Sequence, residues 1–187
     1  MTGQISDGLI YKSQIFCIVG VDGVGLFEPT QHGFSPQSVT TACWRGYCCT
    51  YNVIEEILYL KELIITLSLK QKLIVKHGRA KDFLGVFPCL RDTPVGHPST
   101  IYDELNHLVE FTGSLLVAKN FIKSLYVHLG FQPAYKYEEV HQLIFKSGYL
   151  MQSINRSEEM AEIRQKIIPP FNFYDQWHLT WRGKNGS

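Results

Sequence analysis

Two consecutive segments rich in β-branched and aromatic residues constrain the fold of this chain most strongly. They cover residues 40–53 and 58–69, and only Ile54-Glu55-Glu56-Ile57 separates them. Two such segments with a short connection predict an antiparallel β-hairpin, although this connection lacks the glycine that a tight turn favours. Large apolar groups stand at even and odd positions of the first segment, as Trp44 and Tyr47 show. This pattern indicates a strand that is covered on both faces.

A second hairpin is predicted from residues 138–145 and 149–154, because Ser147-Gly148 between them supplies the positive φ of a tight turn. A third strand of the first hairpin is expected at 73–75, and another strand over 9–27. The latter is broken by Gly20, Gly23 and Gly25, whose G-x-x-G-x-G spacing favours a strand end or bulge over a phosphate-binding loop.

The clearest helix is predicted for residues 155–168. Asn155 can cap its N-terminus, Glu158 stands at the N3 position of a capping box, and Met160 begins the apolar stripe. The segment 106–129 fits either a helix or a pair of strands turning at Lys119-Asn120, and the strand interpretation is preferred.

Together these elements predict an α+β fold, in which an antiparallel, hairpin-built sheet carries a C-terminal capped helix packed on it. A length of 187 residues favours a single globular domain over residues 1–187. Long loops are expected near 28–38 and 88–100, with a frayed tail at 183–187.

Composition excludes several classes of protein. Charged residues make up 19% of the chain and the net charge is +1, which argues against disorder and against a global field that attracts nucleic acid. We find neither a secretory signal nor an apolar run long enough to span a bilayer. We therefore expect a cytoplasmic protein with five reduced cysteines and no membrane partner.

Short segments resemble a bacterial protein family for which no activity is established. They are T-A-C-W-R-G-Y at residues 41–47, followed by L-Y-L at 58–60, and F-T-G-S-L-L at 111–116. The resemblance implies a bacterial origin and hairpins at these places, and it transfers no catalytic residue.

The cysteines are candidate metal ligands. Cys43 and Cys48 have a spacing that zinc sites use, but on a strand the two positions point to opposite faces, as do Cys48 and Cys49. Buried thiols are the preferred interpretation, and a catalytic thiolate stays open. We expect no metal and no cofactor.

The strongest charge feature is a run of cations in residues 70–81, made up of Lys70, Lys72, Lys76, Arg79 and Lys81. Such a run protects an exposed edge strand from unwanted pairing, or it binds phosphates or an acidic protein. Trp44 and Arg45 are a further candidate for recognition. Alternatively, Arg45 forms an ion pair inside the protein, with Glu62 across the hairpin as its expected partner.

Candidate catalytic residues are few. Glu139 and His141 lie two apart on a predicted strand, so they share a face, which is the geometry of a carboxylate-oriented imidazole. Asp92 and His97 lie on the expected loop 88–100.

These observations predict a non-catalytic interaction module that recognises a protein partner in a bacterial multi-component system. One alternative is a small hydrolase or nuclease built from His97, Asp92, His141 and Glu139. Another is backbone-directed contact of nucleic acid with residues 70–81. Whether the protein is an enzyme stays open, with the non-catalytic interpretation preferred.

Overall fold

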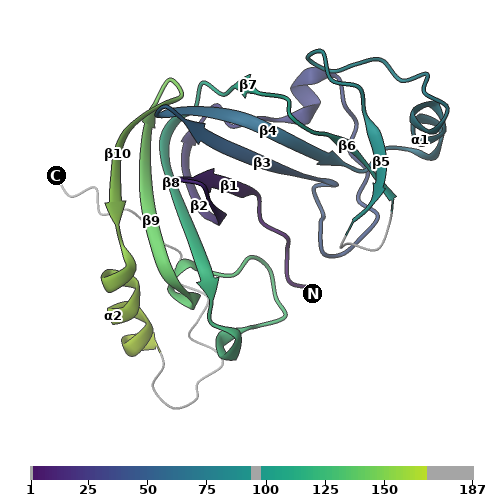
Figure 1. Ribbon diagram of the computed structural model, residues 1–187. Coiled ribbons are helices and arrows are strands. Elements are labelled where there is room, and N and C mark those ends of the chain that lie inside the picture. The colour runs from purple at the N-terminus through teal and green to yellow at the C-terminus, as the bar shows by residue number, and fades with distance from the viewer. Residues whose placement is uncertain (1, 94–97, 168–187) are drawn as a thin grey trace.

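The computed structural model describes residues 2–93 and 98–167, and within them the chain forms ten strands and two α-helices (Figure 1). The strands are β1 (Gly8–Tyr11), β2 (Gln14–Val24), β3 (Tyr47–Ile54), β4 (Ile57–Ile65), β5 (Cys89–Asp92), β6 (Pro98–Tyr102), β7 (His107–Leu108), β8 (Thr112–Phe121), β9 (Tyr137–Lys146) and β10 (Tyr149–Asn155). The helices are α1 (Leu69–Lys76) and α2 (Ser157–Ile167), with short 3-10 turns η1 (Pro29–His32), η2 (Lys123–Leu125) and η3 (Ala134–Lys136).

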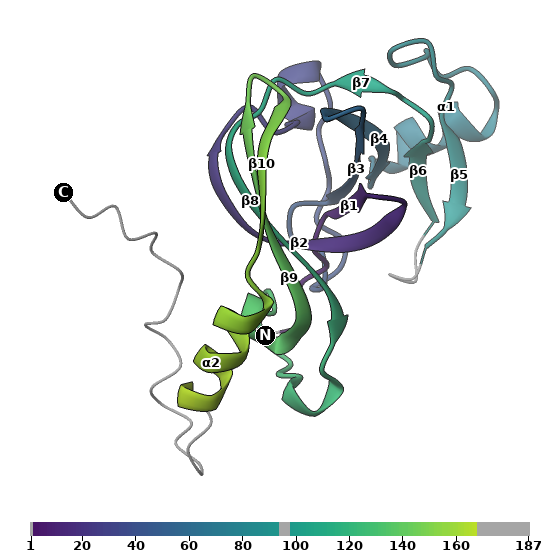
Figure 2. The same ribbon diagram turned by 60° about the vertical axis from the view of Figure 1, so that its left-hand side comes forward.

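The sheet closes on itself. Its order runs β10-β9-β8-β2-β1-β3-β4, and β10 then pairs with β4 through Tyr149 and Ile57. Backbone hydrogen bonds seal this seam, from the Leu58 N–H to the Gly148 carbonyl and from the Leu150 N–H to the Glu56 carbonyl. Seven strands therefore form a closed barrel, visible as the curved wall in Figures 1 and 2. The β1–β3 pairing is parallel, so the barrel is mixed.

This closure overturns the predicted α+β fold. An open hairpin-built sheet would leave the end of β10 unpaired, whereas here the turns of the two predicted hairpins meet and join β10 to β4 at Tyr149 and Ile57. Both hairpins themselves are confirmed, with β3 paired to β4 and β9 to β10. The first one is shorter than predicted, because β3 begins only at Tyr47 and residues 40–46 form turns.

Tight turns with positive φ connect the strands of these hairpins. Ser147 and Gly148 adopt φ of 48° and 84°, as their sequence predicted, while Glu55 and Glu56 reach 48° and 63° without any glycine. A third turn of this kind, at Lys12-Ser13, divides the predicted strand 9–27 into β1 and β2. Two residues in the left-handed region match the twist of the flanking strands, which explains why all three turns have this form.

Glycines allow β2 and β8 to approach closely. Gly23 faces Gly113 across the pair, and a Cβ atom on Gly23 would lie 2.4 Å from the carbonyl oxygen of Thr112. A Cβ on Gly113 would lie 2.2 Å from the carbonyl oxygen of Asp22. A register shift between Ile18 and Gly20 agrees with the bulge that was one of the two expected outcomes, but β2 is not broken there and continues through Gly20 and Gly23 to Val24. Bulges bend strands, which helps a sheet to close into a barrel.

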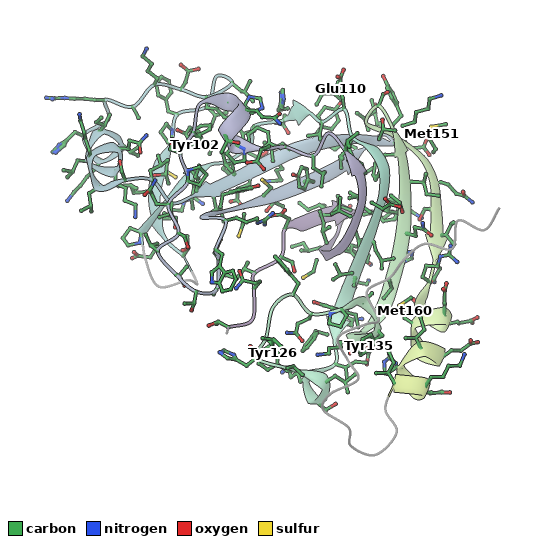
Figure 3. The ribbon with its side chains drawn as sticks, turned by 180° about the vertical axis from the view of Figure 1, so that it is seen from behind. Tyr102, Glu110, Tyr126, Tyr135, Met151 and Met160 are labelled. Atoms are coloured by element: carbon green, nitrogen blue, oxygen red, sulfur yellow. The ribbon has the colours of Figure 1, made fainter. Side chains whose placement is uncertain are left out.

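Alternating side chains of the barrel strands fill its interior. The fully buried residues there include Leu9, Tyr51, Leu58, Leu60, Leu63, Ile65, Phe111, Leu115, Val117, Leu143 and Phe145. A separate cluster lies under α2 on the outer face of β8 and β9, with Leu116, Val140 and Met160 among its members. Figure 3 shows Met160 beside Tyr135 at the end of the barrel away from Glu110.

The C-terminal helix is confirmed, although its start differs from the prediction. It begins at Ser157, so Glu158 lies in the first turn and not at N3. The Asn155 side chain accepts a hydrogen bond from the Ser157 N–H at 2.9 Å. Arg164 then ties the helix to the strand it covers by donating to the carbonyl oxygens of Tyr135 and Tyr137, each at 2.7 Å.

An extension beyond the barrel carries β6, β5 and α1, which lie together at the right of Figure 1. Two sequence predictions were wrong here. Residues 73–75 belong to helix α1 and not to a third strand, and most of the expected loop 88–100 forms the β5–β6 hairpin. The segment 106–129 contains strand β8, as preferred, but β8 continues through Lys119-Asn120, where a turn was expected, with only a local irregularity at Asn120, whose φ is 58°.

No helix among the described residues is both long and apolar enough to cross a bilayer. The predicted frayed tail at 183–187 lies outside the described residues.

Candidate functional site

The basic segment 70–81 lies on a helix and the loop that follows it. Ser68 and Gln71 form a reciprocal capping box, in which the Ser68 hydroxyl accepts from the Gln71 N–H and the Gln71 side chain accepts from the Ser68 N–H. This S-x-x-Q signal was present in the sequence and would have predicted the helix. Protection of an edge strand therefore cannot explain these cations, because the segment is not a strand.

The cations of this segment face solvent. Lys70, Lys76, Arg79 and Lys81 are exposed, and Lys72 is half-buried. No acidic residue occurs between positions 69 and 81. Within the part of the chain that the structure describes, none of the five forms an ion pair.

Large apolar side chains are exposed among these cations. Leu69 and Leu73 of α1 are 81% and 55% exposed, and Phe87 in the following loop is 72% exposed. Leu84 projects from a tight turn closed by reciprocal backbone hydrogen bonds between Phe83 and Val86. We call residues 69–87 with these side chains the α1 surface. Exposed apolar side chains beside cations are typical of a surface that binds another protein.

A groove of about 420 Å³ borders the α1 surface. Ile74 and Val75 of α1 line one side of it, Lys81 and Asp82 lie along the loop, and four aromatic rings make up much of the rest. We call it the aromatic groove.

The rings of the aromatic groove pack edge to face. Phe34, Phe83 and Tyr102 contact one another with centroids 5.0–5.8 Å apart. His32 continues the row, since it lies 5.6 Å from Phe83 and stacks on Phe27 at 4.7 Å. Figure 3 labels Tyr102 within this part of the molecule. Because these rings already pack against one another, a ligand that binds to them would cost little side-chain entropy.

His32 also lines a second hollow of about 340 Å³, with Glu28, His107 and Glu110. The rings of His32 and His107 lie 6.2 Å apart. Burial, and then the nearby His32, lower the pKa of His107, so its imidazole is neutral at pH 7. Glu28 is held by the Tyr47 hydroxyl, which donates to it at 2.9 Å. His32 thus links the aromatic groove to this second hollow, which Glu28 and Glu110 also line, whereas the α1 side of the groove carries the cations.

Arg45 has a partner inside the protein, but it is Asp7 and not Glu62. Two hydrogen bonds of 3.0 and 2.7 Å join the guanidinium to the carboxylate, which also accepts from the Cys49 N–H. The guanidinium lies 4.7 Å from the centre of the Tyr47 ring. Trp44 is 57% exposed and remains free to contact other molecules.

Glu139 and His141 share a face of β9, as the sequence predicted. The His141 Nε2 lies 3.0 Å from a Glu139 carboxylate oxygen, and Lys119 lies 3.0 Å from the other oxygen. The hydrogen bond with His141, and then Lys119, lower the pKa of Glu139. The His141 ring packs edge-on against Phe16 at 5.6 Å. Each polar group is thus occupied by a neighbour, which is typical of a half-buried sheet histidine.

Asp92 lies on β5, the last strand of the extension, where it faces Pro98. Within residues 2–93 and 98–167 no recorded interaction joins Asp92 to Glu139 or His141. His97 lies outside the described residues. The structure therefore does not assemble the predicted hydrolase or nuclease site from the members that it describes.

Cys43 and Cys48 are brought together, although the sequence placed them on opposite faces of a strand. Cys43 lies in the turn before β3, and its Sγ atom is 3.7 Å from the Cys48 Sγ. Among the described residues, no group of three or more His, Cys, Asp and Glu side chains is placed to hold a metal ion.

Comparison with known proteins found no family model, no curated protein and no solved structure that matches this chain.

Proposed function

We propose that the protein is a non-catalytic interaction module that binds an acidic segment of a protein partner in a bacterial multi-component system. The observation that carries this proposal is the α1 surface, where five cations that form no ion pair with any described residue surround exposed apolar side chains beside the aromatic groove.

The cations of the α1 surface and the shape of the aromatic groove indicate which kind of segment would bind. Acidic side chains of a bound segment would pair with Lys70, Lys76 and Arg79, and an apolar side chain of the same segment would enter the aromatic groove. Arg and aromatic groups at the centre of a patch carry most of the binding energy at protein interfaces. Long-range attraction between the cations and an acidic segment would also speed association.

Exposed leucine and phenylalanine side chains favour a protein over a nucleic acid as the partner. A phosphate backbone is bound through cations and hydrogen-bond donors, and side chains such as Leu69, Leu73 and Leu84 add nothing to such a contact.

Affinity capture from bacterial cells, followed by direct binding of the captured protein, tests the proposal. Leu73→Asp and the double variant K76E/R79E should each lose at least tenfold in affinity, because one removes an apolar contact and the other reverses two charges. Met151→Asp is the matched control, since Met151 is 64% exposed on β10, away from the α1 surface. Its affinity should equal that of the wild type.

Two results would overturn the proposal. One is equal loss of binding in Met151→Asp and Leu73→Asp. The other is a ligand that proves to be RNA or DNA, with binding that falls steeply with salt and is unaffected by Leu73→Asp.

A further inference from the structure

Cys43 and Cys48 form a pair of thiols whose placement depends on a specific turn. The turn begins where the Cys43 N–H donates to the Thr40 carbonyl at 3.2 Å, and it ends where the Gly46 N–H donates to the Cys43 carbonyl at 3.1 Å. Gly46 has φ of 73°, and a Cβ atom there would lie 2.6 Å from the Gln37 carbonyl oxygen. Only glycine fits this position, so the turn returns the chain into β3 with the two sulfurs facing each other.

The N-terminal segment holds this turn in place from the other side. The Ile5 N–H donates to the Ala42 carbonyl, and the Gln4 side chain donates to the Thr41 carbonyl at 2.6 Å. Asp7 fixes Arg45 with two hydrogen bonds. The turn is thus attached to the rest of the fold, and the short distance between the sulfurs is a property of that fold.

The surroundings of the pair favour a thiolate on Cys43. The hydrogen bond from Cys48, together with the Gly46 backbone and the nearby Arg45, lowers the pKa of Cys43 to about 6, even though partial burial opposes this. The same contact raises the pKa of Cys48, so Cys48 is the thiol of the pair that keeps its proton. The Cys43 sulfur also lies 3.3 Å from the Tyr47 carbonyl oxygen, to which the Cys43 thiol donates when it is protonated. Cys43 is therefore the sulfur that would attack an electrophile, and Cys48 is the sulfur that would then attack Cys43.

The two sulfurs are only partly accessible to molecules in solution. Cys43 is 8% exposed and Cys48 is half-buried. A bulky disulfide would not reach Cys43 easily, whereas a hydroperoxide as small as hydrogen peroxide would. Cys49 takes no part, because it is 1% exposed in the barrel core and burial raises its pKa.

We propose that Cys43 and Cys48 form a peroxide-reactive dithiol site that closes reversibly to a disulfide. The Cys43 thiolate attacks one oxygen of the hydroperoxide, the O–O bond breaks, and Cys43 becomes a sulfenic acid while hydroxide or alkoxide leaves. The Cys48 sulfur then attacks the Cys43 sulfur, its proton passes to the departing hydroxide, and water and a disulfide are formed. Each sulfur loses one electron, and the two electrons reduce the peroxide.

Mass spectrometry of the reduced full-length chain, treated with increasing hydrogen peroxide and then with an alkylating agent, tests this site. We expect the wild type to lose the mass of two hydrogen atoms and to yield one cross-linked peptide pair that joins Cys43 to Cys48. Thioredoxin or dithiothreitol should restore the starting mass. This measurement needs no variant, so a folding defect cannot obscure it.

Variants assign the two roles. In Cys48→Ser, a sulfenic acid should persist on Cys43 and be trapped by dimedone, because the second thiol is missing. In Cys43→Ser, the reaction of Cys48 with peroxide should slow at least tenfold. Cys17→Ser removes an exposed thiol on β2 and should leave disulfide formation unchanged.

Two outcomes would overturn the proposal. The first is a wild-type chain in which Cys17 or Cys89 oxidises before Cys43. The second is oxidation of Cys43 directly to sulfinic acid with no Cys43–Cys48 cross-link.

Discussion

On the barrel and the segments that flank it, several charged side chains form ion pairs within the chain, whereas on the α1 surface the cations face solvent. Arg45 is bound to Asp7, Lys119 to Glu139, and Arg156 to Glu159. Phe111 in the barrel core is fully buried, and Phe87 on the α1 surface is 72% exposed. The α1 surface differs from the barrel in combining exposed apolar side chains with a run of cations that have no ion pair among the described residues, so both kinds of group are available to another molecule there.

The largest expected contrast is in core packing. Phe111→Ala should lower the free energy of unfolding by about 3–5 kcal/mol, because it opens a cavity inside the closed barrel. Phe87→Ala should change it by less than about 0.5 kcal/mol, since that ring is mostly in solvent. Urea denaturation of both variants measures the difference. An equal loss of unfolding free energy in the two variants would show that Phe87 and the α1 surface are part of the packed core.

Two cysteines extend this comparison, because the Cys43 thiol lies against Cys48 whereas Cys17 is exposed. Cys43 should react with iodoacetamide at a rate that rises with pH and is half-maximal near pH 6, because its pKa is about 6. An ordinary cysteine has a pKa of about 8.5. The rate at Cys43 should therefore level off above pH 7, while that of the exposed Cys17 is still rising. Peptide mapping of alkylated protein measures both. A Cys43 rate that still rises at pH 8 would contradict the paired arrangement.

The next largest difference in stability is expected between removing a charged group that has a partner and removing one that faces solvent. Asp7→Ala should cost about 1–3 kcal/mol, because it leaves the Arg45 guanidinium and the Cys49 N–H without their shared acceptor. Lys76→Ala should be nearly neutral, within about 0.5 kcal/mol, since Lys76 is exposed and has no ion pair among the described residues. Thermal unfolding of the two variants compares them. If Lys76→Ala lowers stability as much as Asp7→Ala, the distinction between partnered charges and the solvent-facing cations of the α1 surface is wrong.

The smallest expected effect is local. Ser68→Ala removes the α1 cap and should destabilise that helix by about 1 kcal/mol. Amide hydrogen exchange should speed up over residues 69–76 and stay unchanged in β8 and β9. Faster exchange throughout the barrel would show that α1 is not an independent extension.

Local chemistry allowed part of this fold to be predicted from the sequence. The hairpin at β9 and β10 was readable because Ser147-Gly148 favours a tight turn, and the bulge at Gly20 was readable from its glycines. Helix α1 was missed although its Ser68–Gln71 capping box was visible, because three apolar residues in a row were interpreted as a strand.

Features that depend on distant contacts could not be predicted. Barrel closure rests on a meeting of two turns, Glu55-Glu56 and Ser147-Gly148, that are far apart in sequence. The aromatic groove gathers Phe34, Phe83 and Tyr102 from three separate segments. The approach of Cys43 to Cys48 depends on where β3 begins, and strand ends are the least certain part of a sequence-based prediction.

Hydrogen–deuterium exchange of the chain, alone and bound to its captured partner, tests the central claim most directly. We predict that binding slows exchange in residues 68–87 and around Tyr102, and leaves α2 and β9 unchanged. Slower exchange confined to α2 and β9, with none in residues 68–87, would contradict the assignment of the α1 surface as the binding site.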